Sequence, residues 1–209
     1  LKKNTSDLIK IKFNLLLILS ILFFSTNIYA EEKFVGFIES LDGKAFKNDN
    51  GKKIKLNVFD QIFVGSEIVI ESNSNATISF LDNSILTLSS DSTFVVKNFD
   101  NLSQNPEFII LFNKGNFTFE SGTIAKNKNG NMKINISEME VALNGTLITG
   151  SNSDEEQQVS LVEDSMGRVG TLSVTVGDQT TTITDPSKGI SLSGNNEIEE
   201  ISLSEEETN

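Results

Sequence analysis

Apolar residues alternate with polar ones from Phe34 onward, and turn-forming residues interrupt the alternation every eight to twelve residues. Alternation with period two places apolar side chains on one face of an extended strand. Short strands separated at such even intervals are typical of all-β domains. We therefore predict a single all-β domain of short antiparallel strands, built as two packed sheets or as a short flattened solenoid. Helix is expected only in an N-terminal signal segment.

Individual strands can be placed from their turn signals. Asp42-Gly43 is a strong two-residue hairpin signal between two alternating runs. Residues 108–112 are continuously apolar, which favours a strand that is buried on both faces. The residues expected to be buried are Phe80, Leu86, Leu88, Phe108, Ile110, Phe117, Phe119, Leu143 and Leu172.

Residues 1–30 have the order of a secretory signal peptide. Four lysines lie at the start, an apolar run follows over residues 13–24, and Ala30 supplies a small residue at the expected cleavage point. The alternative is an uncleaved membrane anchor, but a spanning helix needs about 20 apolar residues. Ser25 and Asn27 end this run before that length. We predict cleavage after Ala30 and export to the periplasm or out of the cell.

The charge of the processed chain limits its partners. The whole chain has 17 basic and 29 acidic residues, and removal of residues 1–30 leaves 13 and 28, a net charge near −15. Such a surface repels phosphate backbones and anionic lipids. We therefore expect no nucleic-acid partner and no membrane insertion after signal cleavage.

The predicted domain organisation has three parts. Residues 1–30 are the signal peptide, residues 31–195 form the all-β domain, and residues 196–209 form an acidic tail. That tail holds six glutamates and no basic residue, which indicates disorder. Its few apolar residues leave open one weak edge strand instead.

Composition also limits the chemistry. The chain has no cysteine and no histidine, so it lacks disulfides, thiolate nucleophiles, the usual general base and the commonest nitrogen ligand for metals. Asp82 and Ser84 have no base beside them in sequence, and Asp82 is expected to accept hydrogen bonds within its own turn. Residues 48–51 and 154–156 are rich in oxygen ligands but do not match the twelve-residue calcium loop. We predict no catalytic, cofactor-binding or metal-binding residue, no cofactor and no enzymatic activity.

Two motifs, about sixty residues apart, are more specific. Residues 76–88 form an alternating hairpin pattern around Asp82-Asn83-Ser84, and residues 140–149 contain Asn144-Gly145-Thr146 directly after an apolar strand. Together they resemble the FecR-type domain, the extracytoplasmic module named after the bacterial iron-dicitrate sensor. That family carries a D-G-S hairpin and a later G-T pair. Asn83 stands here for the glycine of the hairpin, and Asn144 stands where the family often has arginine.

The resemblance extends over residues 34–193. Residues 36–45 are similar to the first hairpin of the family, residues 55–68 to its second strand pair, and residues 161–176 to its closing strands. Val58-Phe59-Asp60 stands where the family usually has glycine before aspartate. Gly145 is expected to have a positive φ angle or a strand packed against its Cα.

In the best-known members, this domain is the periplasmic part of a membrane-spanning anti-sigma regulator that senses a loaded outer-membrane transporter. The resemblance therefore implies a periplasmic or cell-envelope module that binds a protein and takes part in regulation. Only about a dozen residues precede the apolar segment, so we expect a freestanding, secreted form of the module. The expected partner is an unidentified envelope protein. The alternative is a structural or surface-exposed component of the envelope or of an adhesin.

Overall fold

The computed structural model describes residues 32–49, 51–193 and 197–203. All the elements described below lie within the compact unit Lys33–Asn209. The predicted signal peptide, residues 1–30, lies outside the described residues. No helix within the described residues is long and apolar enough to cross a membrane.

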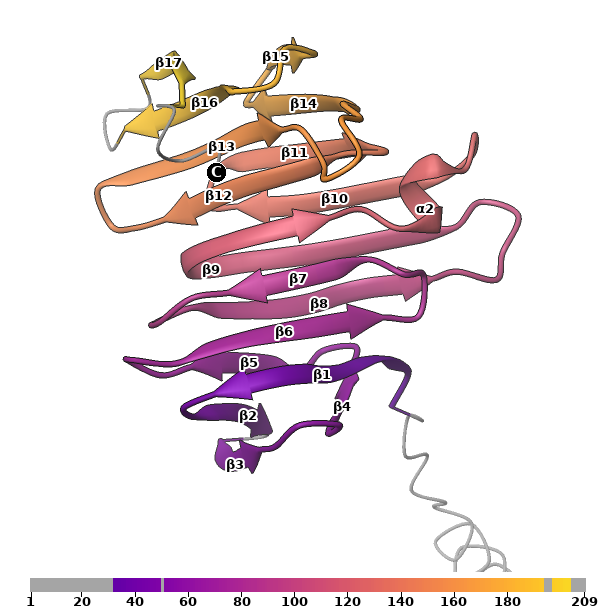
Figure 1. Cartoon of the computed structure of the whole chain (residues 1–209), viewed down its shortest axis with the longest axis vertical. Coiled ribbons are helices and arrows are strands. Elements are labelled where there is room, and N and C mark those ends of the chain that lie inside the picture. The colour runs from indigo at the N-terminus through magenta and orange to yellow at the C-terminus, as the bar shows by residue number, and fades with distance from the viewer. Residues whose placement is uncertain (1–31, 50, 194–196, 204–209) are drawn as a thin grey trace, which may run out of the picture. The chain divides into compact units, whose positions relative to one another are not determined.

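The regular elements of the described residues are strands, apart from one short helix (Figure 1). Their bounds are β1 (Phe34–Asp42), β2 (Ala45–Asp49), β3 (Lys52–Leu56), β4 (Gln61–Phe63), β5 (Glu67–Ile70), β6 (Asn75–Phe80), β7 (Ile85–Leu88), β8 (Thr93–Asp100), β9 (Glu107–Glu120), α2 (Thr123–Lys126), β10 (Asn131–Ile136), β11 (Met139–Asn144), β12 (Leu147–Asn152), β13 (Glu156–Val162), β14 (Thr171–Val176), β15 (Gln179–Ile183), β16 (Lys188–Ser193) and β17 (Ile198–Ser202).

The strands build two sheets that share β9. Sheet A has the order β4-β1-β6-β7-β9-β12-β13-β16-β17, and Figure 1 looks onto this sheet. Sheet B has the order β3-β2-β5-β8-β9-β10-β11-β14-β15 and lies behind it. Every pairing is antiparallel except that of β9 with β10. The first of the two predicted arrangements, two packed sheets, describes this fold.

Strand β9 joins the two sheets because it bends in its middle. Its first half pairs with β8 and β10 in sheet B, and its second half pairs with β7 and β12 in sheet A. The bend includes Gly115, which has a φ angle of 99° and lies against the backbone of Ser92. A side chain is unwelcome there because a Cβ would approach the Cα of Ser92 to 2.6 Å.

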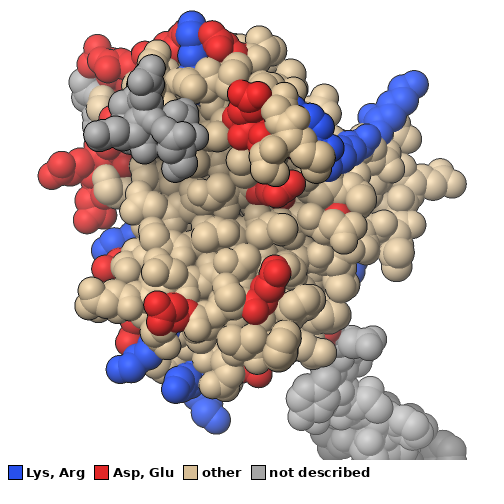
Figure 2. Space-filling model, viewed as in Figure 1, with Lys and Arg blue, Asp and Glu red and all other residues tan. Residues whose placement is uncertain are grey.

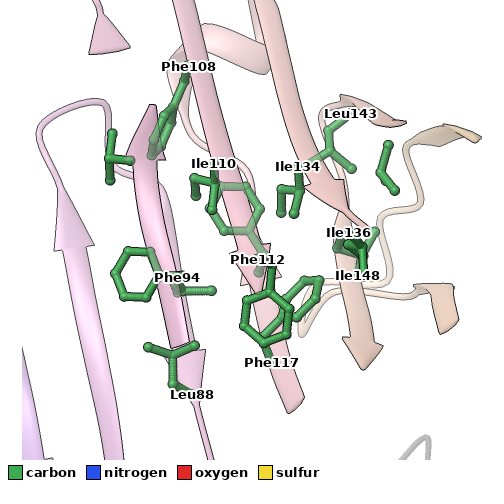
Figure 3. Packing of buried hydrophobic residues seen from close by; sticks show 14 of the residues in the cluster. Leu88, Phe94, Phe108, Ile110, Phe112, Phe117, Ile134, Ile136, Leu143 and Ile148 are labelled. Carbon is green, nitrogen blue, oxygen red and sulfur yellow. The ribbon is translucent and has the colours of Figure 1, made fainter. Parts of the chain in front are cut away.

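The core fills the space between the sheets, where alternate residues of each strand point inward (Figure 3). Phe108 is fully buried, and its ring makes edge-to-face contacts with Phe80, Phe99 and Phe119 at centroid distances of 4.8, 4.9 and 6.1 Å. All nine residues that the sequence predicts to be buried are buried, so the prediction of the inward face is confirmed.

Two local predictions were wrong. Ile109 and Leu111 lie on the outer face of sheet B and are only half buried, so the apolar run 108–112 is not covered on both sides. Flanking strands shield these residues without a third layer. Helix is also not confined to the N-terminal segment, because α2 forms one turn at Thr123–Lys126. This turn lies in the crossover from the end of β9 in sheet A to β10 in sheet B.

The last described strand, β17, lies within the segment 196–209 that the sequence assigns to an acidic tail. It pairs with β16 from Lys188↔Ser202 to Leu192↔Ile198. This strand corresponds to the weak edge strand that the sequence left open. Lys188 pairs with Glu200 at 3.0 Å across the two strands, and this contact raises the pKa of Lys188 above its ordinary value.

Candidate functional site

The first sequence motif forms the turn between β6 and β7. Asp82 is buried, and its Oδ1 accepts the backbone N–H of Ser84 at 3.0 Å while its Oδ2 accepts the Ser84 hydroxyl at 2.9 Å. Asn83 has a φ angle of 65°, a conformation that asparagine tolerates better than most residues. Asp82 thus accepts hydrogen bonds within its own turn, as predicted, and Asn83 fills the position of the family's glycine.

The same motif holds the residues at the start of α2. The Ser84 hydroxyl accepts the backbone N–H of Gly122 at 2.8 Å, and the Asp82 carbonyl accepts the N–H of Thr123 at 2.7 Å. The first of these bonds is buried, and both satisfy donors at a helix start that would otherwise lack partners. The turn of one hairpin therefore fixes the chain as it leaves β9.

The second motif is hydrogen-bonded to Ser121, the residue directly before Gly122. The N–H of Thr146 donates to the hydroxyl of Ser121 at 2.7 Å, and the N–H of Ser121 donates to the carbonyl of Thr146 at 3.0 Å. Gly145, directly before Thr146, has a φ angle of 64°. A positive φ angle is the first of the two geometries predicted for this glycine. The two motifs therefore meet at Ser121-Gly122, a pair that sequence reasoning missed. Its only signal is two small residues directly after a long alternating strand.

This junction is closed to a substrate. Ser84 is fully buried, and its hydroxyl already donates to Asp82 and accepts from Gly122. A nucleophile needs both an activating base and an open approach, and Ser84 has neither in this geometry. Among the described residues, no group of three or more acidic side chains is placed to hold a metal ion. The junction is best explained as a structural feature that ties both motifs to the segment after β9. We refer to its residues, Asp82, Ser84, Ser121, Gly122 and Thr146, as the clamp. The absence of enzymatic activity stays a prediction.

A small hollow lies beside the clamp, between the end of β9 and the loop that follows β13. Its volume is about 140 Å³, and its lining includes Thr146, Asp164 and Arg168. Asp164 accepts the backbone N–H of Arg168 at 2.9 Å and its Nε–H at 2.7 Å, and these bonds hold the pKa of Asp164 below its ordinary value. Small-molecule sites usually exceed about 300 Å³, so this hollow is small for a ligand.

Replacing Gly145 with valine should lower the free energy of unfolding by about 2–3 kcal/mol, because a β-branched residue fits poorly at positive φ. The space around Gly145 is open, and the nearest atom to a Cβ is Cγ of Lys126 at 3.7 Å, so the cost is conformational. Urea unfolding followed by circular dichroism measures it. Gly145→Asn is the control and should cost much less, since asparagine adopts this conformation. Equal stability of the two variants would contradict the prediction.

The sheet edges are the other features that a partner could use. Sheet A ends at β4, which has three residues, and at β17, which carries Glu199 and Glu200. Sheet B ends at β3, which carries three lysines, and at β15. Short length and charged side chains protect edge strands from pairing with other chains. Strand β15, with the sequence QTTTI, has five residues, as β3 and β17 do, but it carries no charged side chain, and its first four residues are exposed.

The β14–β15 hairpin shows which backbone groups of β15 face outward. Val176 pairs with Gln179 next to the two-residue turn, so this pair exchanges hydrogen bonds across the hairpin. Because bonded and non-bonded pairs alternate, the N–H groups of Thr180 and Thr182 point away from β14. No described strand pairs with that side of β15.

The described unit is therefore a two-sheet β-module, closed at its clamp and open at one edge. Residues 66–169 match the model of the FecR protein family, a range that runs from just before β5 to the loop after β13 and includes both motifs. The chain thus contains a FecR domain, as the motifs indicated.

Solved structures show the same fold. Two crystal structures, at 1.65 and 2.50 Å resolution, are of "a putative anti-sigma factor" from Parabacteroides distasonis ATCC 8503. Each superposes with a TM-score of 0.53 at 13% sequence identity, and the match covers 65% of this chain and 59% of that protein. The chain therefore spans less than two thirds of that protein. A comparison with curated proteins found no match.

Proposed function

We propose that this chain is an exported regulatory module that acts in the cell envelope by binding a protein partner, without turnover. The FecR domain supports a regulatory role, because the best-known members of that family are signalling proteins. The likeness in fold to the protein described as "a putative anti-sigma factor" agrees with this class. The order of charged, apolar and small residues over positions 1–30 supports export.

The observation that carries the proposal is the unprotected edge at β15. An extended segment of a partner adds to such an edge by backbone hydrogen bonds, while its side chains give specificity. The outward N–H and C=O groups of Thr180 and Thr182 provide that backbone, and the threonine side chains favour strand geometry. The three other edges are shortened or charged, so strand addition is directed to one place.

Thr182→Pro should abolish partner binding while the domain stays folded. Proline removes the outward N–H of residue 182 and is tolerated at edge-strand positions whose N–H faces solvent. The measurement is retention of partners from a bacterial envelope extract by the immobilised protein, quantified by mass spectrometry. Proteins retained by the wild type should fall at least about tenfold with Thr182→Pro, a loss of about 1.4 kcal/mol.

The matched control is Lys55→Pro. Lys55 has the same position relative to its hairpin turn, since Asp49 pairs with Lys52 next to that turn and Lys55 follows with an outward N–H. This variant puts the same substitution on the lysine-protected edge and should retain the partners. Undiminished retention by Thr182→Pro would rule out the β15 edge. If the immobilised wild-type protein retains no protein from the extract, the binding role is ruled out.

A further inference from the structure

The outer face of sheet A carries a continuous row of hydroxyl side chains. Thr77 pairs with Thr87, Thr87 with Thr118, Thr118 with Thr149, and Thr149 with Ser160. The row therefore crosses five adjacent strands at one register position. Neighbouring strands lie about 4.8 Å apart, so the row is about 19 Å long. We refer to these five residues as the hydroxyl row.

The residues on either side of the hydroxyl row are also ordered. On one side lie amide and hydroxyl side chains, namely Asn75, Ser89, Asn116, Ser151 and Gln158. The other side combines three half-buried apolar residues with one hydroxyl and one carboxylate, namely Ser79, Ile85, Glu120, Leu147 and Val162. Figure 2 looks onto this face and shows a few separate acidic side chains on it, with uncharged surface between them.

The hydroxyl groups of the row make no hydrogen bond to any other described residue, although threonines on sheet B do. On sheet B, Ser173 pairs with Thr182 at 3.0 Å and Thr175 with Thr180 at 2.9 Å, so those hydroxyls satisfy one another. Each free hydroxyl of the row offers one donor and two acceptor positions. Sheet A thus presents an array of unpaired donors and acceptors at regular spacing.

A shallow hollow of about 430 Å³ lies over one part of the row. Thr87, Thr118, Thr149 and Ser160 line it, and Leu203 lies at its margin. Ser160 is only 2% exposed, and it lines this hollow. A ligand in the hollow would meet the hydroxyl groups of these four residues, which can donate and accept hydrogen bonds.

We propose that this face binds a neutral glycan chain. A sugar ring presents hydroxyls that both donate and accept, which match the hydroxyl and amide side chains of this face. It also presents apolar C–H faces, which match the side chains of Ile85, Leu147 and Val162. The strand spacing of about 4.8 Å is close to the length of one ring in an extended glycan, so successive sugars would meet successive threonines. Glu120 would accept from a sugar hydroxyl, a charge-assisted bond.

Charge excludes the other polymeric ligands of this shape. The hydroxyl and amide rows contain no lysine or arginine, so they offer no counter-charge to phosphate or to acidic polysaccharides. The large negative charge of the chain repels such polyanions further. The volume of the hollow falls within the range of about 300–1,000 Å³ that is usual for ligand sites.

The test is titration calorimetry with three neutral probes, namely cellohexaose, chitohexaose and maltohexaose. The wild-type protein should bind at least one of them saturably. The double variant Thr118→Val/Thr149→Val should weaken that binding at least about tenfold, or 1.4 kcal/mol. Valine keeps the shape and strand preference of threonine and removes only the hydroxyl. Ser160→Ala should also weaken binding, while leaving the fold intact.

The matched control is Ser173→Ala/Thr175→Val, which removes two hydroxyls from the outer face of sheet B and should bind the glycan as the wild type does. Failure of all three probes to bind at millimolar concentration would overturn the proposal. So would equal affinity of the two double variants. If no glycan binds and the Thr118→Val/Thr149→Val variant changes the sedimentation of the protein, the face is an interface between copies of the chain instead.

Discussion

Replacing Phe108 with alanine should lower the free energy of unfolding by about 3–5 kcal/mol, at the upper end of the range for large-to-small changes in a core. Phe108 is fully buried and touches the rings of Phe80, Phe99 and Phe119. These partners come from β6, β8 and the second half of β9, so the cavity would open between the two sheets. Relaxation around it is limited because both sheets converge there on β9.

Equilibrium unfolding in urea, followed by far-UV circular dichroism, measures this change. Leu102→Ala is the control, because Leu102 is 90% exposed in the loop before β9 and should change stability by no more than about 0.5 kcal/mol. If the two variants unfold at the same urea concentration, the ring cluster does not hold the sheets together. The slope of the transition should stay unchanged, since it reports the surface exposed on unfolding.

The sequence predicted the strands and their inward faces because alternation is a local property. Residues such as Phe80, Leu86 and Leu172 lie two apart from other apolar residues, and each strand needs only one buried face. Local patterning failed at Ile109 and Leu111, where apolar residues lie on both faces of β9. Whether a second face is covered depends on the neighbouring layers, which a single strand's pattern does not contain.

The candidate surfaces depend on pairings that no local pattern specifies. Thr77, Thr87, Thr118 and Thr149 form a row only because β7 pairs with both β6 and β9, and β9 pairs with β12. A change of register by one residue would turn each threonine into the core. Likewise, an uncharged strand such as β15 is common inside a sheet. It is open to pairing with another chain only because it lies at an edge, and the sequence of β15 does not show that position.

The clamp illustrates a third limit. Asp82 and Gly145 were found from the order of residues around them, and their turn geometry follows from well-understood preferences. Their common partner, Ser121-Gly122, has no such signature. It is defined by what the two motifs contact after folding, across 38 residues for Ser84 and 25 for Thr146.

Gly122→Ala should therefore destabilise the domain by about 3 kcal/mol or more. A Cβ at this position would approach the backbone nitrogen of Ser84 to 2.5 Å and Oδ2 of Asp82 to 2.7 Å, and would come closer still to the Asp82 carbonyl. These atoms are held by their own hydrogen bonds. Relief of the overlap must move the start of α2, at a cost of about 1–3 kcal/mol for overpacking and about 1 kcal/mol for each hydrogen bond lost.

Gly145→Ala separates this steric effect from backbone strain. Gly145 has positive φ and open space around it, so alanine there should cost only about 1–2 kcal/mol. Urea unfolding of both variants gives the comparison, and amide hydrogen exchange at Gly122 and Thr123 in the wild type should show strong protection, because both N–H groups donate within the clamp. If Gly122→Ala costs no more than Gly145→Ala and these amides exchange freely, the clamp is mobile. Asp82 and Ser84 would then be accessible at times, and their purely structural role would have to be abandoned.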